Sequence, residues 1–289
     1  ASLLIMTGLS IAVAFRVGLF NIGAQGQFMV GALAAAWLGA NFEVTAWIHL
    51  PVCLAGAALG GALYASIAAL LKITRGVHEV ISTIMLNWVA VSFIDNWLVS
   101  GPLRATAQGE SSISGTAQIA PTAELPRILG DVSRLHWGSI LALVVSMCVA
   151  IFLSRFVRGY EWRVAGLNRH AAEVAGIHVD RCMFEAMALS GALAGLAGAM
   201  LILGTELKYP ASIGSSYGFD GIAIAFIAQS NPFGIVAASV FFGGLRSGGT
   251  GLQLLGIHKS FPDLIAACAL VFMAMQSTWE RVMHRWRRA

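Results

Sequence analysis

Charge is scarce in this chain: 11% of its 289 residues are Asp, Glu, Lys or Arg, whereas 57% are hydrophobic. Soluble domains carry roughly 25% charged residues, and a soluble protein this apolar would expose large sticky patches. Lipid is the solvent that fits, because about 20 apolar residues cross its hydrocarbon core as a helix. Continuous apolar runs such as Ile140–Leu153 do not alternate as in a membrane β-barrel. We therefore expect an all-α, polytopic integral membrane protein.

Cysteine is also rare, with four residues and no CxxC spacing, so the sequence indicates neither a disulfide framework nor a zinc site. The chain contains no GxxxxGK[ST] loop, which excludes ATP hydrolysis of that kind. No Ser/His/Asp, metal-ligand or paired-carboxylate cluster stands out, and the Arg-rich segments lack the interleaved aromatics of a nucleic-acid site. We expect no enzyme, no metal and no nucleic-acid partner.

The apolar residues fall into nine segments, several of them shorter than a full span. They are Leu3–Phe15, Ile22–Ala40, Ala46–Leu71, Val80–Val99, Trp137–Leu153, Met183–Gly204, Gly221–Ala228, Phe233–Leu245 and Phe261–Gln276. Short segments predict tilted, broken or re-entrant helices, which occur where protein or a watery cavity covers the backbone. No soluble domain is separable, so residues 1–289 are expected to form one transmembrane domain, with a further helix missing before Ala1.

Lys and Arg in short loops set the orientation of a membrane protein. Three basic stretches stand out: Lys72 with Arg75, the segment 154–181, and the tail from Arg281 onward. Placing all three in the cytosol gives about nine crossings, with the N-terminus outside and the C-terminus inside. The long external loop, 101–136, is either a partly ordered cap over a pore mouth or a flexible connector.

Three amide side chains stand at the start of a membrane segment, within the glycine-interrupted motif 18–27. They are Asn21, Gln25 and Gln27. Amides in lipid need partners or a wet cavity, and at helical spacing Asn21 and Gln25 would share a face. Two interpretations stay open: a polar wall of a substrate path, or interhelical hydrogen bonds that fix the packing.

Glu79, Thr83 and Asn87 step by four residues and therefore lie along one side of a predicted helix. Glu79 stands near the cytosolic end beside Arg75 and His78, so an ion-paired or snorkelling carboxylate is the favoured interpretation. Thr83 and Asn87 are candidates for the substrate path, and Asn87 is the better one because it lies deeper.

The segment 154–181 is polar and Arg-rich between two apolar runs. Its alanines favour a helix, and glycines punctuate it. A short helix along the membrane face can present a surface to a partner; a loop that only sets topology is the alternative. We expect a cytosolic docking segment. Its candidate coupling residues are Arg163, Gly166, Asn168, Ala171, Ala172 and Gly176.

Asp220 stands at the start of a short apolar run that Asn231-Pro232 separates from the next one. It can cap a helix start, and a half-helix aimed at the membrane interior is typical of transporters, so Asp220 is also a candidate for the path. Upstream, small residues spaced by four predict faces where helices pack closely. These pairs are Gly191 with Gly195, and Ala194 with Gly198.

Taken together, these stretches resemble the permease subunit of bacterial ABC importers of the branched-chain amino acid, ribose and nucleoside type. Within that group the likeness is greatest to the nucleoside (purine, BMP-lipoprotein-linked) permeases. It runs from around Thr7 to around Phe272. The residues that carry it are Gly18–Gly23 with Gly26 and Gln27, Glu79–Thr83 with Met85–Asn87, Arg163–Asn168, Ala171, Ala172, Gly176, Ile177, Ser190–Gly195 and Gly218–Ile222. Gln25 departs from the family, where many relatives carry Glu.

The resemblance implies partners and a mechanism. Two permease subunits, identical or paralogous, would form the channel in the bacterial inner membrane. Cytosolic ABC ATPase subunits would dock around residues 163–176 and use the ATP, with no cofactor in this chain. A periplasmic or lipoprotein substrate-binding protein would deliver a small polar solute, most closely a nucleoside or purine.

Deep ionisable residues are scarce, and an ion-driven carrier would need them to bind and release protons or Na⁺. Energy supplied from outside the chain therefore fits better. Two alternatives stay open: an ion-coupled secondary transporter that works without an ATPase, and a membrane scaffold that binds an ATPase without transporting. The residues do not determine which nucleoside, sugar or amino acid is carried, or whether the permease pair is identical.

Overall fold

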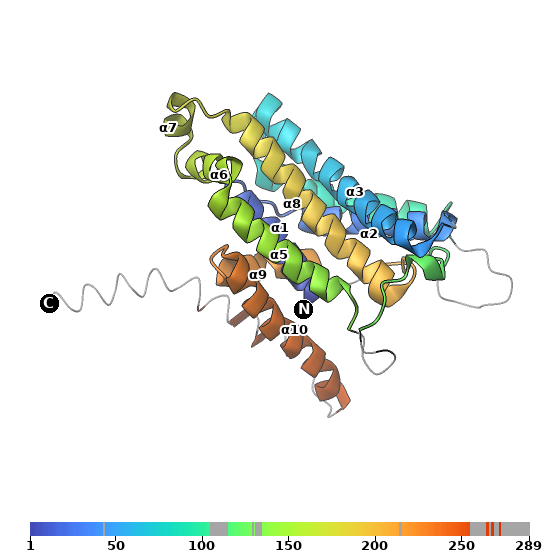
Figure 1. Cartoon of the computed structure of the whole chain (residues 1–289). Helices are drawn as coiled ribbons and strands as arrows, with labels where there is room; N and C mark the ends of the chain where they lie inside the picture. The colour runs from blue at the N-terminus through green and yellow to red at the C-terminus, as the bar shows by residue number, and fades with distance from the viewer. Residues whose placement is uncertain are drawn as a thin grey trace.

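The computed structural model describes residues 1–42, 44–104, 115–128, 130, 135–213, 216–254, 264, 265, 267, 268 and 272. These residues form helices joined by short connections, with no strand among them beyond two isolated bridges (Figure 1). The helices are α1 Ser2–Phe15, α2 Ala24–Asn41, α3 Ala46–Arg75, α4 Glu79–Ala90 with a π-helical continuation Val91–Val99, α5 Gly138–Arg155, α6 Val157–Leu167, α7 Arg169–Val174, α8 Val179–Leu201 with a π-helical continuation Ile202–Glu206, α9 Tyr217–Ile227 and α10 Pro232–Leu254.

The protein is an all-α membrane protein, as the apolar segments predicted. Within the described residues, four helices are long and apolar enough to span a bilayer: α3, α4 with its continuation, α5, and α8 with its continuation. Two apolar helices, α1 and α9, are shorter, as the short segments Leu3–Phe15 and Gly221–Ala228 indicated. Most of the ninth predicted segment, Phe261–Gln276, lies outside the described residues.

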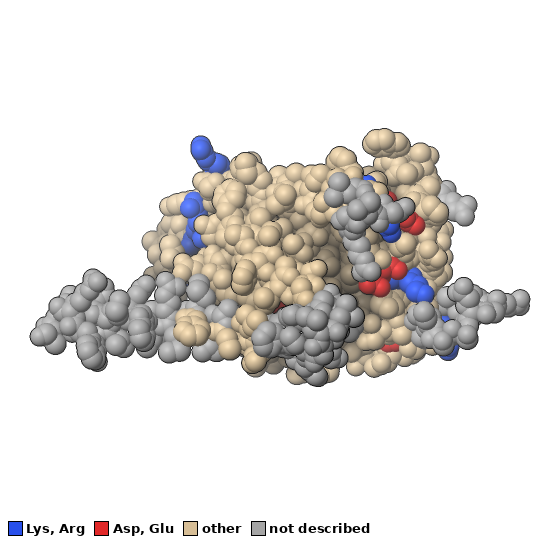
Figure 2. All heavy atoms as spheres, turned by 90° about the horizontal axis from the view of Figure 1, so that it is seen from below, with Lys and Arg blue, Asp and Glu red and all other residues tan. Residues whose placement is uncertain are grey.

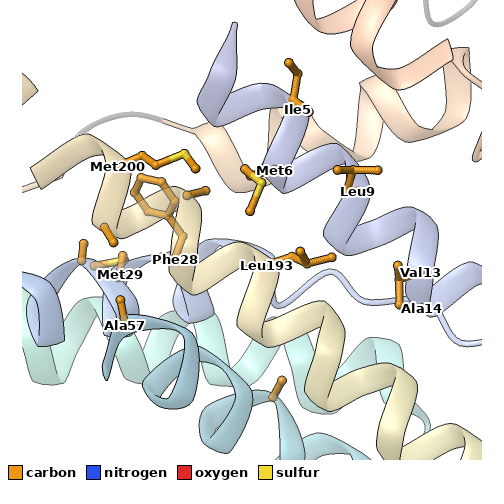
Figure 3. Close-up of a cluster of buried hydrophobic side chains, with 14 of the residues drawn as sticks. Ile5, Met6, Leu9, Val13, Ala14, Phe28, Met29, Ala57, Leu193 and Met200 are labelled. Atoms are coloured by element: carbon orange, nitrogen blue, oxygen red, sulfur yellow. The ribbon is translucent and has the colours of Figure 1, made fainter. Parts of the chain in front are cut away.

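Helix α8 is the centre of the bundle. In its most apolar 18-residue window 78% of the residues are buried, against 33% or less in α3, α4 and α5. Leu193 and Met200 of α8 meet Met6 of α1 and Phe28 of α2 in the hydrophobic core (Figure 3). A helix buried on all sides must contact other helices instead of lipid, and small residues allow the close approach that this requires.

The predicted small-residue faces are where α8 meets its neighbours. Gly191 of α8 lies so close to Gly61 of α3 that a Cβ on either glycine would overlap the carbonyl oxygen of the other. Gly195 has the same relation to the carbonyl of Ala57 in α3, and Gly198 to that of Phe28 in α2. At each of these positions the absence of a side chain is what lets two backbones touch.

The basic stretches that the structure describes lie at one end of the bundle. Gly166 of α6 packs on the backbone of Arg16, and Arg16 donates from Nη2 to the carbonyl of Ser230, at 2.8 Å. Helices α3 and α8 run antiparallel, which brings Arg75 to the same end (Figure 1). On the face seen in Figure 2, most of the visible charged side chains lie toward the two ends, and most of the visible surface between them is uncharged.

Part of the predicted external loop covers the opposite end. The backbone N–H of Ala120 donates to Gly39 at the end of α2, and that of Ile119 donates to Leu207 after α8, at 2.7 and 2.9 Å. Residues 115–128 of the loop are therefore tied across the bundle, an arrangement closer to a cap than to a free connector. Residues 105–114 lie outside the described part of the chain.

Candidate functional site

The amide of Asn21 makes four hydrogen bonds in the middle of the bundle. Its Nδ2 donates to Gln27 Oε1 and to Ser190 Oγ, both at 2.8 Å. Its Oδ1 accepts from the Gly23 N–H at 2.9 Å and from Gln27 Nε2 at 3.0 Å. Ser190 in turn donates to the carbonyl of Ser10 in α1, at 2.6 Å. Asn21 is fully buried, and its hydrogen-bonding capacity is used in joining α1, α2 and α8.

Asn87 and Gln25 join two further elements to the start of α2. Asn87 of α4 accepts from the Gly26 N–H and donates to the carbonyl of Ile22, both at 2.8 Å. Gln25 accepts from the N–H of Gly218, the second residue of α9, at 2.8 Å. The side chain of Asn87 therefore fixes the backbone at residues 22–26 to α4. The side chain of Gln25, within the same stretch, fixes the start of α9.

The sequence prediction that Asn21 and Gln25 share a helix face is wrong. Helix α2 begins at Ala24, so Asn21 lies in the preceding turn, and the two amides point to different partners. Thr83, fully buried, donates to the carbonyl of Glu79 in its own helix at 2.7 Å, and its Cβ lies against Gly23. The structure thus gathers five of the predicted path residues around the beginning of α2, engaged with protein atoms. They are Asn21, Gln25, Gln27, Thr83 and Asn87.

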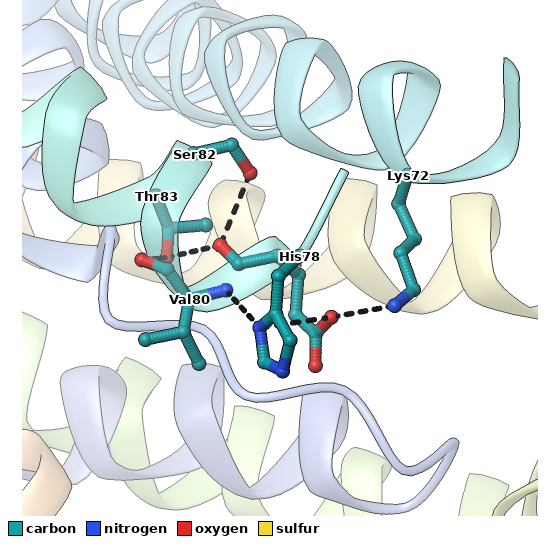
Figure 4. Close-up of polar contacts among 6 residues, drawn as sticks. Lys72, His78, Val80, Ser82 and Thr83 are labelled. Carbon is teal, nitrogen blue, oxygen red and sulfur yellow. Dashed lines mark hydrogen bonds and ion pairs between the residues drawn. The ribbon is translucent and has the colours of Figure 1, made fainter. Parts of the chain in front are cut away.

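Glu79 is ion-paired, as predicted, but its partner is Lys72 of α3. The Lys72 Nζ lies 3.0 Å from Glu79 Oε2, while His78 Nδ1 is 3.7 Å away (Figure 4). The pair closes the turn between α3 and α4, where Gly76 adopts a left-handed conformation with φ of 66°. Position and partner both indicate a structural role at the helix junction.

Replacement of Asn87 by alanine is expected to destabilise the fold. The substitution leaves the Gly26 N–H and the Ile22 carbonyl buried without a partner, and each such group costs about 1–3 kcal/mol. The thermal unfolding temperature of the purified chain in detergent should fall by several degrees. Asn41→Ala is the matched control, because Asn41 is exposed and donates only to Trp37 in its own helix. Equal unfolding temperatures for Asn87→Ala and the wild type would show that the hydrogen bonds of Asn87 to the start of α2 do not stabilise the fold.

Asp220 lies in a different environment from the amides. Helix α9 begins at Tyr217, so Asp220 is its fourth residue, and the prediction that it caps the helix is wrong. It pairs instead with Arg246 of α10, whose guanidinium also lies over the Tyr217 ring, 4.8 Å from its centroid. Both charged side chains are about one-third exposed, 34% and 39%. An ion pair within apolar helices faces water or a partner, because lipid would not solvate it.

Sequence reasoning did not single out Arg246. It lies inside a glycine-rich part of α10 where small residues are exposed: Gly244, Ser247 and Gly248. A Cβ added at Gly244 or Gly248 would meet no atom within 4 Å. A lone arginine in an otherwise apolar helix is the signal that could have found this face.

Helix α9 is a half-helix of 11 residues. Its first half lies against Gln25 and against Thr7 in the middle of α1. Ser230, three residues after the end of α9, accepts a hydrogen bond from Arg16 at the end of α1. Asn231-Pro232 then separates it from α10, as predicted, with Pro232 as the first helical residue. The N-terminus of α9, which carries a partial positive charge, therefore opens at mid-depth, beside Asp220 and Arg246.

The polar segment 154–181 forms two helices that project from the end of the bundle (Figure 1). Asn168 separates them and caps α7, since its Oδ1 accepts from the Ala171 N–H at 3.1 Å. Gly176, with φ of 80°, ends the turn after α7. Ala172 is the buried side of α7, and Leu167 and Val174 are 87% and 91% exposed.

Ion pairs hold the projecting helix in place. Arg169 contacts Glu173 and Asp180, each at 3.0 Å, and the hydrogen bond with Glu173 raises the pKa of Arg169 above its ordinary value. Arg169 thereby connects α7 to the start of α8. The two helices therefore present two bare apolar side chains away from the bundle, Leu167 at the end of α6 and Val174 at the end of α7.

Comparison with known proteins agrees with this architecture. Residues 1–275 match the family of branched-chain amino acid transport system permease components. The chain is 39% identical to the guanosine ABC transporter permease protein NupP of Bacillus subtilis, covering 93% of this chain and 77% of that protein. It is 31% identical to the nucleoside ABC transporter permease protein NupB of Lactococcus lactis, over 94% and 76%, respectively. The glucose ABC transporter permease protein TsgB13 of Haloferax volcanii is 28% identical, over 96% and 75%.

No solved structure shows significant similarity to the chain. The family match covers nearly the whole chain, and the helical bundle, the half-helix and the projecting helix pair are all formed by residues within it. The chain is therefore a multi-pass membrane protein that belongs to the family of branched-chain amino acid transport system permease components.

Proposed function

We propose that this chain is a permease subunit of an ATP-driven importer and that its solute is a nucleoside or purine. The observation that carries the proposal is the half-helix α9, which opens at mid-depth beside the partly exposed pair Asp220–Arg246. Discontinuous helices that start within the membrane form the solute sites of many transporters. The names of the two nucleoside permeases at 31% and 39% identity support the choice of solute.

The path follows the open face of α9 and α10. Asp220 and Arg246 offer an acceptor and several donors to a polar neutral solute, and Tyr217 offers a ring for stacking. Nucleosides carry hydroxyls and a base that suit such groups. The buried amides Asn21, Gln25, Gln27 and Asn87, with Thr83, frame this face and fix where the half-helix starts.

The partners follow from the projecting helix pair. An ABC ATPase docks on α7 and the end of α6 and binds the ATP, so no cofactor resides in this chain. Leu167 of α6 and Val174 of α7 supply the apolar contact. A second permease subunit completes the channel, and a periplasmic or lipoprotein binding protein delivers the solute at the end covered by residues 115–128. In this orientation α6, α7 and the C-terminus are cytoplasmic.

Reconstitution of the complex tests the proposal. Proteoliposomes with the permease pair, ATPase and binding protein should accumulate labelled guanosine when ATP is supplied, and not labelled glucose, riboflavin or leucine. Uptake by the purified chain under an ion gradient without an ATPase would instead establish an ion-coupled carrier. ATP turnover that no solute stimulates would establish a scaffold.

Asn168→Ala is expected to uncouple the ATPase from transport. Loss of an N-cap costs a helix about 1 kcal/mol, and α7 has only six residues. Uptake should fall severalfold while the subunits still co-purify. Asn168→Asp is the matched control, because aspartate caps equally well and should keep wild-type uptake. If both variants transport normally, α7 is not the coupling element.

A further inference from the structure

Three arginines line one groove at the end of the bundle that carries α6 and α7. The groove has a volume of about 410 Å³ and lies between α1, α5, α6 and the start of α10. The arginines are Arg16 at the end of α1, Arg155 in the last turn of α5, and Arg163 in α6. No acidic side chain lines it among the residues described there.

These three cations are not neutralised within the described part of the chain. Arg158, Arg169 and Arg181 of the same region each pair with a carboxylate, whereas no such pair involves Arg16, Arg155 or Arg163. The Nε atoms of Arg16 and Arg163 are buried and make no hydrogen bond to the described residues. Each helix C-terminus offers roughly half a negative charge, which offsets only part of three full positive charges.

Packing holds the groove in this shape. Gly166 lies on the backbone of Arg16, and Arg163 precedes Gly166 by one turn, so the two guanidinium groups are neighbours. Burial, and then repulsion from Arg163, lowers the pKa of Arg16. On the other wall Ser146 of α5 donates to the carbonyl of Pro232, at 3.2 Å, which pins α5 to the start of α10.

The groove is charged at one end and apolar at the other. Met147 and Ile151 line it together with Arg155, and Met147 lies about 12 Å along the helix axis from Arg155 at 1.5 Å per residue. Met147 and Ile151 belong to an exposed apolar stripe on α5 that continues through Leu143 and Val144. A ligand that satisfies both ends must carry an anion on one side and hydrocarbon on the other.

We propose that the groove lined by Arg16, Arg155 and Arg163 binds the headgroup phosphate of an anionic phospholipid, whose acyl chains lie along the exposed stripe of α5. A guanidinium binds phosphate oxygens through paired N–H donors, and basic pockets between membrane helices are suited to anionic headgroups. An acidic side chain of a partner subunit could reach the arginines, but it would leave the apolar part of the groove unfilled. The lipid would fasten α5 to α6, directly beside the projecting helix α7.

Native mass spectrometry of the delipidated full chain tests the site. Dioleoyl phosphatidylglycerol should bind at least about fivefold more tightly than dioleoyl phosphatidylcholine, because each basic residue contributes about 1 kcal/mol. Arg155→Gln should lower the phosphatidylglycerol affinity about fivefold without changing the unfolding temperature in detergent. Arg75→Gln is the matched control, since Arg75 lies at the same end but does not line the groove, and its affinity should stay at the wild-type value.

Four results would overturn the proposal. The two lipids could bind equally, or Arg155→Gln and Arg75→Gln could lower the affinity alike, which would indicate a general basic surface. Inorganic phosphate at millimolar concentration could displace the lipid, which would indicate a site for a free anion. Addition of the ATPase subunit could displace it, which would indicate an acidic protein partner. If Arg155→Gln lowers the unfolding temperature, Arg155→Lys replaces it as the test. Lysine keeps the positive charge, so this variant must retain the preference for phosphatidylglycerol, and loss of that preference would overturn the proposal.

Discussion

Replacing Gly61 by valine is expected to prevent the chain from folding. The Cβ of any residue at position 61 would overlap the carbonyl oxygen of Gly191 and would crowd Gly195. Overpacking a tight core costs typically 1–3 kcal/mol and occasionally more. Here the atoms that the new side chain would meet are backbone atoms of α8, which cannot move aside alone, so α3 and α8 must separate. Because α8 is the most buried of the four long apolar helices, that separation opens the centre of the bundle. Size-exclusion chromatography in detergent should show aggregate in place of a monodisperse peak.

Gly60→Val is the control for this experiment. Gly60 precedes Gly61 in the same helix, so it has nearly the same helix propensity and the same apolar surroundings, but its Cβ would lie 3.4 Å from a Val30 methyl, an ordinary contact. The smaller change Gly61→Ala should lower the unfolding temperature, and Gly60→Ala should raise it slightly because alanine favours helix. If Gly60→Val and Gly61→Val fold equally well, α3 and α8 do not touch at this seam.

Replacing Arg246 by alanine is expected to reduce solute uptake by the reconstituted complex at least tenfold. The substitution removes the cation that pairs with Asp220 and lies over the Tyr217 ring, so the open face of the half-helix changes from a charge pair to a net negative charge. Truncating one member of a buried charge pair costs 2–5 kcal/mol. This pair is about one-third exposed, so the cost is smaller, but about 1.4 kcal/mol already reduces a rate tenfold. Uptake of labelled guanosine should fall at least tenfold, while the complex still assembles and binds ATP.

The reversed pair Asp220→Arg with Arg246→Asp separates pairing from mere loss of charge. It should recover part of the uptake if the two side chains act on each other, and none if each contacts the solute in a fixed orientation. Arg181→Ala is the control, since Arg181 pairs with Glu185 on the surface of α8 and surface pairs contribute about 0–1 kcal/mol. Wild-type uptake by Arg246→Ala would remove this face from the path.

Local patterns in the chain predicted the helices well. Apolar runs, the Asn231-Pro232 break and the small residues at 191, 195 and 198 act on the backbone nearby or on the first helix that packs there. Predictions made from these patterns therefore do not depend on the tertiary arrangement. The same holds for Gly176, which was expected to punctuate the segment and whose left-handed conformation depends on its own turn.

Partners far apart in the chain could not be predicted in this way. Gln25 meets Gly218 across 193 positions, and Asn21 meets Ser190 across 169. Helix capping was one of two interpretations of Asp220, beside a place in the substrate path, because a carboxylate near an apolar run commonly caps a helix. In the structure an arginine 26 positions later pairs with it. Helical spacing says which residues share a face; it does not say which face meets which helix.

The residues alone determined that the chain lives in lipid, roughly which segments would be helical, and which end of the bundle would carry the basic stretches. These properties depend on transfer of side chains from water to lipid and on conformations within a single turn. The tertiary structure decided which polar groups form hydrogen bonds between helices and which remain exposed. It also brought Arg16, Arg155 and Arg163 into one groove. That choice depends on the close approach of helices at glycine, a property of two backbones together that neither segment carries alone.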